Sequence, residues 1–453
     1  MSFPTDIKII DFSLDFIPVK TRMPLKFGTE ILSSVTCARV KVTVQNKLGE
    51  QSHGWGETPL SVQWVWPSNT EYSIRYDSLL EFCEFIKIRW ESFDYFGHCI
   101  EIGHELIMKD LPQALKQFNL GKKVDSEPMP WLAALVCASP FDIAIHDAFG
   151  MVNNVPIYHA YGKEFLSSDL ASFLDPAEDS EVQFNGRHPS DFLELNPPSE
   201  IPVWHLVGGL DALEQEDLTG GEPNDGYPVY LREWIERDGL NCLKIKLRGN
   251  DAEWDYERLV RIGTISQDLG VQYLTTDFNC TVTDPAYVNE ILDRLELEEL
   301  ETFLRILYVE QPFPYDLEKN RIAVHSVAER KPLFMDESAH DWKHVCLGRE
   351  LGWTGVALKT CKTQTGALLS LCWARAHGMD LMVQDLTNPM LAQIPHVLLG
   401  AHAGTIMGVE SNGMQFYPNA SLKEAKLHPG VYQRNRGMLD ISTIKGNGFG
   451  YGI

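Results

Sequence analysis

The chain has 453 residues, 44% of them hydrophobic and 23% charged, as in ordinary globular proteins, and this length predicts one large domain with a smaller one beside it. A formal net charge of −24 speaks against nucleic acid or an anionic membrane as a partner, so an anionic substrate would need a local cluster of positive charge. Nine scattered cysteines without a CxxC pair, a start unlike a signal peptide and no apolar stretch near the roughly 20 residues that span a bilayer predict a reduced, cytoplasmic protein.

The first 150 residues have the pattern of a small domain in which strands precede helices. Residues 37–43 alternate between apolar and polar side chains, as in a half-buried strand, and a turn near Gly49 leads to a second strand that ends at Glu57. Residues 70–120 and 131–150 carry apolar side chains at helical spacing. This order predicts an α+β domain over residues 1–150.

The remaining residues alternate between strand and helix patterns. Residues 164–200 are acidic, rich in serine and proline and poor in periodicity, which predicts a long insertion or lid, and a second insertion is expected over 211–230. From residue 201 onward, eight apolar runs are separated by helical stretches. The runs are 201–208, 242–247, 271–279, 306–314, 332–338, 355–360, 381–385 and 405–411. Eight such strands predict an α/β fold with a (β/α)₈ barrel over residues 151–424.

Charged residues close these runs at regular intervals. They are Lys244 and Lys246, Asp277 with Asn279, Glu310, Asp336 with Glu337, Lys359, Asp385 and Glu410. From Lys246 to Lys359 the successive steps are 23 to 33 residues long, about one strand and one helix each. Chemistry in a barrel of this kind takes place where the C-terminal ends of the strands meet. The spacing therefore predicts that these side chains converge at one mouth of the barrel.

Three acids on consecutive strands favour a metal site. A single acid at the end of a strand is usually a helix N-cap or a partner in a loop salt bridge. Asp277, Glu310 and Asp336, however, would repel each other and raise each other's pKa if no cation lay between them. Mg²⁺ takes oxygen ligands in octahedral geometry and keeps positions for water or for substrate oxygens. We therefore expect one Mg²⁺ in each active site.

The lysines on either side of these acids suit proton transfer. Lys244 and Lys246 point to the same face of their strand because strand side chains alternate, although a solvated or edge strand would also explain such a pair. Beside a cation, lysines are expected to have lowered pKa values. One of the two is then a candidate base, and the other would keep its neighbour's pKa low and contact the substrate carboxylate. Lys359 would lie across the barrel, where it could return the proton on the other face.

The segments LKIKL, TDFN, YVEQPFP, MDES and ALKTCK together resemble the enolase superfamily and, within it, the muconate-lactonizing subgroup of the mandelate racemase/muconate lactonizing enzyme family. The resemblance covers most of the chain and implies a modified (β/α)₈ TIM barrel with an N-terminal α+β capping domain, which residues 425–453 would complete. The roles it implies are Mg²⁺ ligands for Asp277, Glu310 and Asp336, a base pair for Lys246 and Lys359, an electrostatic partner for Lys244, and supporting positions beside the ligands for Asn279 and Glu337.

Departures from the family pattern bear on the substrate. The seventh run reads VQDLTN, so the histidine–aspartate base of the mandelate racemase subgroup is missing, and the paired aspartates of dipeptide epimerases are absent. Glu410 resembles a glutamate that contacts the substrate in cycloisomerases, or else it is a structural hydrogen-bond acceptor. Asp385 is a further candidate contact. Lys26, in the predicted capping loop MPLKFGTEI, and Arg22 are either contacts for an anionic substrate or solvated loop charges.

The sequence thus predicts an enolase-superfamily isomerase or lyase that removes the proton α to a carboxylate through a metal-stabilised enediolate. Lysines on both faces favour a racemase, an epimerase or a cycloisomerase that acts on a small carboxylic acid. A dehydratase of acid sugars or hydroxy acids would instead use one lysine as base, with Glu410 or Lys359 aiding departure of water. A non-catalytic carboxylate-binding homologue is disfavoured because all five metal and base residues are present. Barrels with such caps are often symmetric assemblies, so a homo-oligomer is expected.

Overall fold

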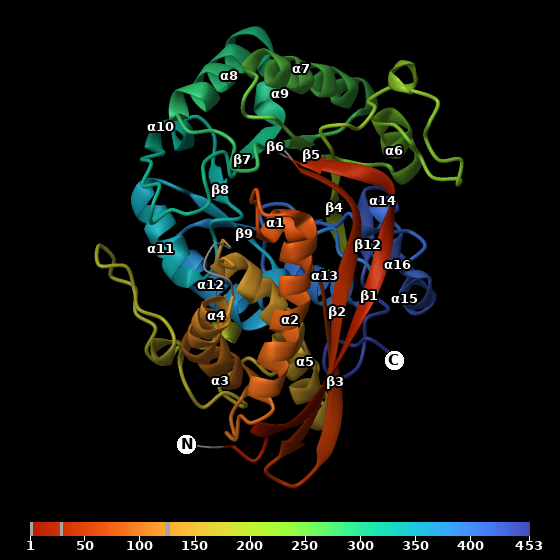
Figure 1. Cartoon of the computed structure of the whole chain (residues 1–453). Coiled ribbons are helices and arrows are strands. Elements are labelled where there is room, and N and C mark those ends of the chain that lie inside the picture. Colours follow the sequence, from red (N-terminus) through yellow and green to blue (C-terminus); the bar gives the residue numbers. More distant parts are fainter. Residues whose placement is uncertain (1–2, 28–29, 123–126) are drawn as a thin grey trace.

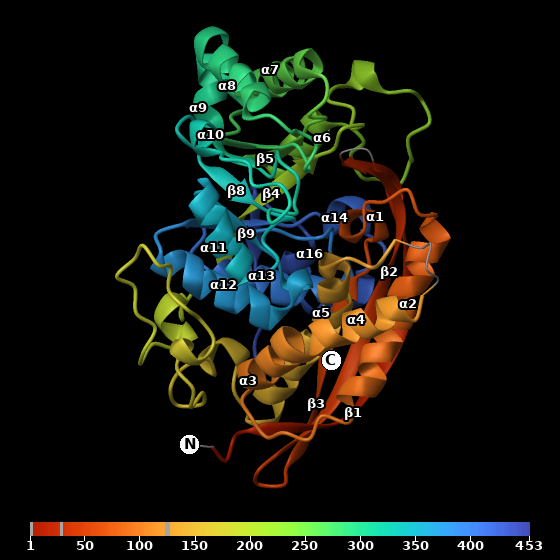
Figure 2. The ribbon, with the colours of Figure 1, turned by 60° about the vertical axis from the view of Figure 1, so that its left-hand side comes forward.

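The structure, a computed structural model, describes residues 3–27, 30–122 and 127–453 (Figure 1). It begins with a three-stranded antiparallel sheet, in the order β1 (Ile7–Phe27), β2 (Glu30–Asn46) and β3 (Gln51–Pro59). The long hairpin of β1 and β2 extends upward to the barrel (Figure 2). There the amide of Gly209 donates a hydrogen bond to the carbonyl of Lys26 (3.2 Å).

Helices pack against this sheet and form the cap with it (Figure 2). They are α1 (Val62–Val65), α2 (Tyr72–Trp90), α3 (Cys99–His104), a π-helical turn (Glu105–Asp110), α4 (Leu111–Leu120) and α5 (Trp131–Val152). The strands-then-helices order expected for this part of the chain is the order that the structure has.

Helix α5 is a core helix that ties the cap to the barrel. Among the residues described, it alone is long and apolar enough to cross a membrane, so the expectation that no apolar stretch approaches bilayer length was wrong. The apolar stretch is nevertheless fully buried inside the protein. Its polar side chains bond internally, because Ser139 Oγ donates to the carbonyl of Thr360 (2.8 Å) and Asp142 accepts from the amide of Thr365 (2.7 Å).

Two glycines let strand β3 lie directly on α5. Gly54 and Gly56 are two residues apart, so both face the helix. A Cβ atom at Gly54 would overlap the backbone of Ala148, and one at Gly56 would overlap the carbonyl oxygen of Pro140. The two glycines of the GWGE segment are therefore required for the backbone of β3 to contact the backbone of α5.

The substitution Gly56→Ala is expected to lower the free energy of unfolding by about 3 kcal/mol, because the added methyl group must push two packed backbones apart. Urea denaturation followed by circular dichroism measures this change. The matched control is Gly221→Ala in a loop, where the nearest atom to an added Cβ lies 3.7 Å away. Equal stability of the two variants would contradict the packing described.

The barrel consists of parallel strands, each overlapping one of the eight predicted apolar runs, which confirms the predicted fold. The strands are β4 (Glu200–Val207), β5 (Cys242–Lys246), β6 (Tyr273–Asp277), β7 (Ile306–Glu310), β8 (Leu333–Met335), β9 (Gly355–Leu358), β10 (Asp380–Val383) and β11 (Val409–Glu410). They pair in the order β10-β9-β8-β7-β6-β5-β4-β11. The two outer strands approach each other where the amide of Ile406 donates to the carbonyl of Leu381 (2.9 Å).

Helices surround these strands on the outside (Figure 1). They are α6 (Leu231–Asp238), α7 (Ala252–Leu269), α8 (Pro285–Glu298), α9 (Leu300–Arg305), α10 (His325–Ala328), α11 (Trp342–Leu351), α12 (Gln364–Ala376), α13 (Gln393–His402), α14 (Gly413–Phe416), α15 (Leu422–Leu427) and α16 (Pro429–Tyr432). A last strand, β12 (Met438–Asp440), pairs antiparallel with β4. The tail then reaches the cap, where the amide of Phe449 donates to Asp147 of α5 (2.8 Å).

Residues 164–200 pack on the outer helical layer beside α12 (Figure 1). The indole of Trp373 donates to the carbonyl of Asp175 (2.9 Å), and the amide of Ala177 donates to the ring of His377 (3.1 Å). Phe184 of this segment is buried. None of its residues lines the pocket at the barrel mouth. Its few aromatic side chains attach it to the barrel despite its polar composition.

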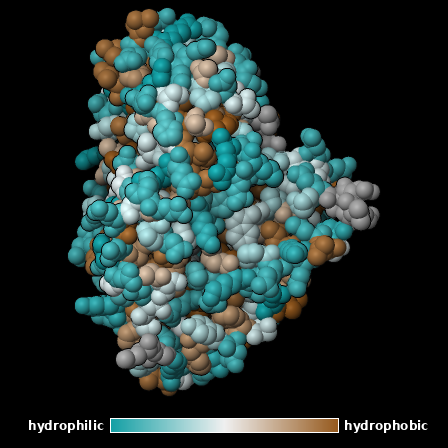
Figure 3. Space-filling model, turned by 90° about the vertical axis from the view of Figure 1, so that its left-hand side faces the viewer, coloured by the Kyte–Doolittle hydropathy of each residue, from teal (hydrophilic) through white to brown (hydrophobic). Residues whose placement is uncertain are grey.

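Figure 3 shows a largely hydrophilic face with apolar patches at the upper end, where α8 and α9 lie. Leu297, Leu300 and Leu304 at the junction of these helices are exposed, and Leu297 is 84% exposed. The opposite side of α8 is buried through Val288, Ile291, Leu292 and Leu295. The exposed leucines are therefore exceptions to the usual pattern, in which the apolar side chains of a surface helix face the core.

Candidate active site

Pairing between neighbouring strands brings the charged residues together at the mouth of the barrel. In the parallel register, Lys246 of β5 lies beside Asp277 of β6, which lies beside Glu310 of β7. Asp336 and Lys359 each follow the last residue of their strand, β8 and β9. All five side chains are buried. Three adjacent carboxylates thus stand between lysines from strands on either side.

Lys244 and Lys246 reach the same carboxylate oxygen, as expected for side chains two residues apart on a strand. Their ammonium groups lie 3.1 and 2.5 Å from Asp277 Oδ2. Lys244 also lies 2.7 Å from Glu310 and 3.0 Å from Glu410. Burial lowers the pKa of Lys244, but these acids raise it further, so its pKa is well above the ordinary value. Acids from three strands thus outweigh the effect of burial at Lys244, whereas the lowered lysine pKa expected from the sequence is that of a lysine beside a bound cation.

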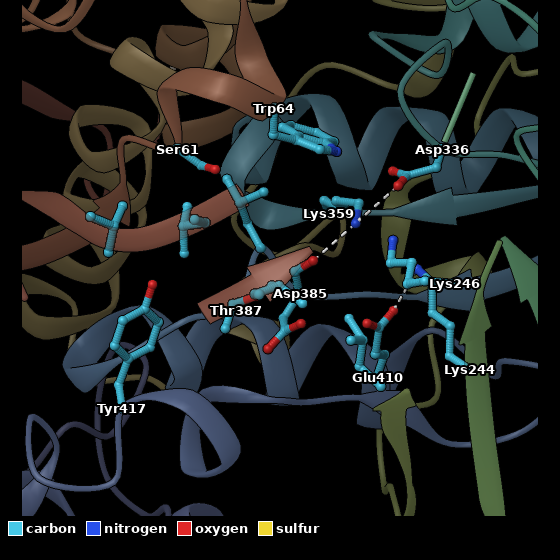
Figure 4. Close-up of a pocket in the computed structure, with 15 residues that line it drawn as sticks. Ser61, Trp64, Lys244, Lys246, Asp336, Lys359, Asp385, Thr387, Glu410 and Tyr417 are labelled. Carbon is cyan, nitrogen blue, oxygen red and sulfur yellow. Dashed lines mark hydrogen bonds and ion pairs between the residues drawn. The ribbon is translucent and has the colours of Figure 1, made fainter. Parts of the chain in front are cut away.

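Lys359 approaches the cluster from the other flank. Its ammonium group lies 3.2 Å from Asp336 Oδ2 and donates to the carbonyl of Asp385 (2.9 Å). Burial lowers the pKa of Lys359 and Asp336 raises it, with a net increase. Figure 4 shows the ends of Lys246 and Lys359 pointing into the same space from different elements.

The three predicted metal ligands have pKa values that move in different directions. Burial and the charge of Asp277 raise the pKa of Glu310 well above its ordinary value. Burial also raises the pKa of Asp277, but Lys246 and Lys244 lower it more. Asp336 behaves like Asp277, with Lys359 as the main lysine that lowers its pKa. The lysines thus lower the pKa of Asp277 and Asp336 below the ordinary value, whereas burial and Asp277 outweigh the contact of Lys244 with Glu310.

These carboxylates have the donor chemistry of a Mg²⁺ site. Asp336 Oδ1 is buried and accepts no hydrogen bond, and Glu337 Oε2 beside it is equally unpartnered. Oxygen atoms of this kind are what Mg²⁺ binds. As they stand, no three acids, histidines or cysteines in the described ranges are gathered tightly enough to hold a metal. Lys244, in contact with both Asp277 and Glu310, holds these two carboxylates in ion pairs, so they would have to turn from it toward a cation.

Asn279 and Glu337 lie next to the ligand candidates and bond to each other. Asn279 has a left-handed backbone (φ 47°), which asparagine tolerates, and its amide donates to Asp277 Oδ1 (2.9 Å). Its side chain donates to Glu337 Oε1 (3.2 Å). Burial and the charge of Asp336 raise the pKa of Glu337 to about 7. Both residues are where the sequence predicted supporting side chains.

Trp64 is a site residue that the sequence interpretation missed. Its indole nitrogen donates to Glu337 Oε1 (3.0 Å), and its ring lies 5.3 Å from the ammonium group of Lys359. It reaches the barrel from α1 of the cap. The only signal in the sequence was the cluster of tryptophans in VQWVW, which follows the strand that ends at Pro59.

Removal of the indole N–H donor of Trp64 should reduce the activity of the site without abolishing it. We expect Trp64→Phe to reduce kcat/KM for substrate by about tenfold, since a buried hydrogen bond to an acid is lost while the ring is kept. Steady-state kinetics on the substrate identified below measures this effect. Trp254→Phe on the outer helix α7 is the control and should leave kcat/KM unchanged. Equal kinetics of the two variants would remove Trp64 from the site.

Glu410 and Asp385 form the opposite wall, and both accept hydrogen bonds from Asn412. Glu410 accepts from Asn412 Nδ2 (2.7 Å), and Asp385 accepts from the Asn412 amide (2.8 Å). Gln384, which the sequence interpretation missed, donates to Glu310 Oε2 (2.6 Å). Glu410 and Asp385 both line the pocket, so the structure is compatible with either alternative for Glu410.

Lys362 is a second buried lysine that was not assigned a role from the sequence. It follows Lys359 by three residues and donates to the carbonyls of Asp336 and Ala339. Burial lowers its pKa, and the nearby carboxylate of Asp336 offsets this only in part. Its contacts hold the chain after β8, and with it the carboxylate of Asp336, in place.

These residues surround a small cavity of about 40 Å³ (Figure 4). Its lining contains Lys244, Lys246, Asp336, Lys359, Asp385 and Glu410 together with Leu25, Leu32, Val35, Ser61, Trp64, Leu206, Leu386, Thr387 and Tyr417. The cap thus closes the barrel mouth through the β1–β2 hairpin and α1.

The two cations expected in the capping loop lie outside this lining. Leu25 pairs with Leu32 across the hairpin, and Lys26 pairs with the exposed Ile31. Because strand side chains alternate, the leucines face the pocket and Lys26 faces away from it. Arg22 is held by Asp225 through two hydrogen bonds (2.8 and 2.7 Å). Arg22 is thus held in an ion pair with Asp225 and does not line this pocket.

Comparison with known proteins agrees with this architecture. Residues 229–453 match the family model described as enolase C-terminal domain-like. No curated protein matches the chain in sequence.

Similar solved structures cover nearly the whole chain. A muconate lactonizing enzyme from Pseudomonas fluorescens is 15% identical, with 98% of this chain and 96% of that one covered and a TM-score of 0.60. An N-succinyl Arg/Lys racemase from Bacillus cereus is 16% identical, with 98% and 95% covered and a TM-score of 0.63. A dipeptide epimerase from Enterococcus faecalis, in complex with Mg and L-Leu-L-Tyr, is 16% identical, with 98% and 99% covered and a TM-score of 0.61.

The fold match spans cap and barrel, and the family model spans the barrel from α6 to the C-terminal residue. Residues 229–453 therefore belong to the enolase C-terminal domain-like family, and the whole chain shares the fold of these solved structures.

Proposed function

We propose that the protein removes and returns the proton α to the carboxylate of a small carboxylic acid, in a Mg²⁺-dependent racemisation, epimerisation or cycloisomerisation. The observation that carries the proposal is the convergence of Lys246 and Lys359 on one pocket, with the acids of β6, β7 and β8 between them. Such an arrangement offers a base on each side of a carbon atom held over the acids.

The proposed metal ligands are Asp277, Glu310 and Asp336. Bound to them, Mg²⁺ would supply positive charge that makes the α-proton more acidic and stabilises the enediolate. Lys246 and Lys359 are ion-paired to two of these acids, at 2.5 and 3.2 Å. Once Asp336 turns away from Lys359, the pKa of Lys359 falls, because the opposite charge beside it is lost.

The proton then moves between the substrate and one lysine at a time. A neutral Lys246 Nζ takes the α-proton on one face, and the ammonium group of Lys359 donates a proton on the other. The reverse reaction exchanges the two roles. Lys244 remains charged and positions Glu410, with which it forms an ion pair. The buried surroundings strengthen every one of these charge interactions.

The similar proteins support this reaction type. Their names include a racemase, an epimerase and a muconate lactonizing enzyme, and one of them was solved with Mg. At 15 to 16% identity they carry no information about the substrate of this chain.

The test is an NMR experiment in D₂O on a library of hydroxy acids, sugar acids and N-acyl amino acids with Mg²⁺. We expect at least one acid to lose its α-proton signal and to give a product that is an isomer of the starting acid. A product that lacks one water molecule relative to the starting acid would instead support a dehydratase activity. If Mg²⁺ binds and no acid in the library exchanges its α-proton, proton abstraction is contradicted in favour of a binding protein.

A further inference from the structure

The pocket has a charged end and an apolar end. Lysines and acids occupy the end at the strand termini. Figure 4 shows Tyr417 on the side away from the lysines. The apolar part of the lining consists of Tyr417 together with Leu25, Leu32, Val35, Leu206 and Leu386. Five of these, all but Leu386, belong to one hydrophobic cluster formed by the cap hairpin and the barrel. A substrate whose α-carbon lies between the lysines must direct its remaining group toward this wall.

Among its described residues, the cap hairpin contributes leucines and a valine to the wall and no charged side chain. Leu25 and Leu32 are a cross-strand pair, 4% and 3% exposed, and face the pocket together. The next pair, Lys26 and Ile31, faces outward. Arg22 is committed to Asp225 and to the carbonyls of residues 227 and 228. The residues of the hairpin that the structure describes therefore bring no cation into the cavity.

The charged groups at the other end are already paired. Lys244 contacts three acids, and Lys246 and Lys359 each contact one. Asp385 accepts hydrogen bonds from the amides of Asn388 and Asn412, and Glu410 is bound by Lys244. In the part of the chain that the structure describes, neither a free cation nor a free carboxylate lines the cavity.

We propose that the substrate is a monocarboxylic acid whose group beyond the α-carbon is apolar, of the branched aliphatic or aromatic kind. This inference rests on the proposed function, because it takes the reacting carboxylate to lie at the charged end. A second carboxylate would lose its hydration against leucines, with only the neutral hydroxyl groups of Ser61, Thr387 and Tyr417 to replace it. An apolar group gains from burial at the same place.

The test compares pairs of acids whose two members share the α-carboxylate and the α-substituent and differ only in the remaining group. The pair is 2-hydroxy-4-methylpentanoate and 2-hydroxyglutarate, with N-acetyl-leucine and N-acetyl-glutamate as a second pair. Binding to the Mg²⁺-loaded protein is measured by saturation-transfer NMR, and α-proton exchange is measured in D₂O. We expect the apolar member of each pair to bind at least tenfold more tightly and, where exchange occurs, to exchange faster.

The two readouts separate this inference from the proposed function. Preference for the apolar member without any exchange would support the apolar wall and contradict proton abstraction. Exchange with preference for the dicarboxylate would overturn the inference and leave the proposed function standing. Absence of binding by both pairs would overturn the inference as well.

Adjacent hairpin residues provide a matched pair of variants. Leu32→Arg places a cation at the pocket and should reduce affinity for the apolar acids at least tenfold while improving that for the dicarboxylates. Ile31→Arg adds the same charge on the exposed side and should leave the preference unchanged, since Ile31 is 49% exposed. An unaltered preference in a folded Leu32→Arg protein would overturn the inference. The comparison of acids on the wild type decides the matter if this variant does not fold.

Discussion

Lys246→Ala is expected to lose α-proton exchange from one enantiomer of the substrate by roughly 10³-fold, and Lys359→Ala is expected to lose it from the other, as for removal of a general base. Each lysine lies on its own flank of the acids, paired with Asp277 or Asp336. Each variant therefore keeps the base that serves the opposite face. The measurement is the loss of the α-proton signal of each pure enantiomer in D₂O with Mg²⁺.

The matched control for these variants is Lys26→Ala. Lys26 belongs to the cap hairpin but lies outside the pocket lining, so exchange of both enantiomers should remain within twofold of the wild type. Circular dichroism establishes that each variant is folded. If both alanine variants lost exchange from the same enantiomer, the assignment of one lysine to each face would be contradicted.

The second large effect is expected for Lys244→Met. Lys244 is 3% exposed in its side chain and contacts Glu310, Glu410 and Asp277. Without the charge of Lys244, the negative charges of three buried acids are not sufficiently neutralised. Removal of one partner of a buried ion pair lowers the free energy of unfolding by about 3–5 kcal/mol. We expect the free energy of unfolding, measured with urea after chelation of metal, to fall by about this amount.

Mg²⁺ should restore part of this lost stability. A ligand stabilises the folded state in proportion to its affinity, and the acids left without Lys244 favour a cation more strongly than in the wild type. The Mg²⁺-induced increase in unfolding free energy should therefore be larger for Lys244→Met. The exposed Lys423→Met serves as control and should change stability by no more than about 0.5 kcal/mol. A metal-free Lys244→Met protein as stable as the wild type would contradict the role given to Lys244.

The architecture could be predicted because it rests on local patterns. Apolar runs and helical spacing are set by neighbouring residues, and the rule that parallel strands end at one mouth then places Asp277, Glu310 and Asp336 side by side. That rule needs no knowledge of the distances between them.

The details that could not be predicted depend on contacts between distant segments. The pKa of Lys244 depends on Glu410, which is 166 residues away along the chain. The direction of Lys26 depends on an irregularity in the pairing of β1 and β2 between Lys20 and Leu25, which changes which side chains face inward. Trp64 comes from the cap and reaches the site only through tertiary packing. Alternation and spacing in the sequence alone do not determine such contacts.

The most direct test of the central claim is the rate at which solvent deuterium enters the α-position of the best carboxylic acid, measured by NMR with Mg²⁺ and again after chelation. The account predicts exchange with Mg²⁺ and at least a 10²-fold slower rate without it, with recovery when Mg²⁺ is added back. Exchange at the same rate after chelation would contradict the assignment of Asp277, Glu310 and Asp336 as metal ligands. Absence of exchange in both conditions would contradict proton abstraction itself.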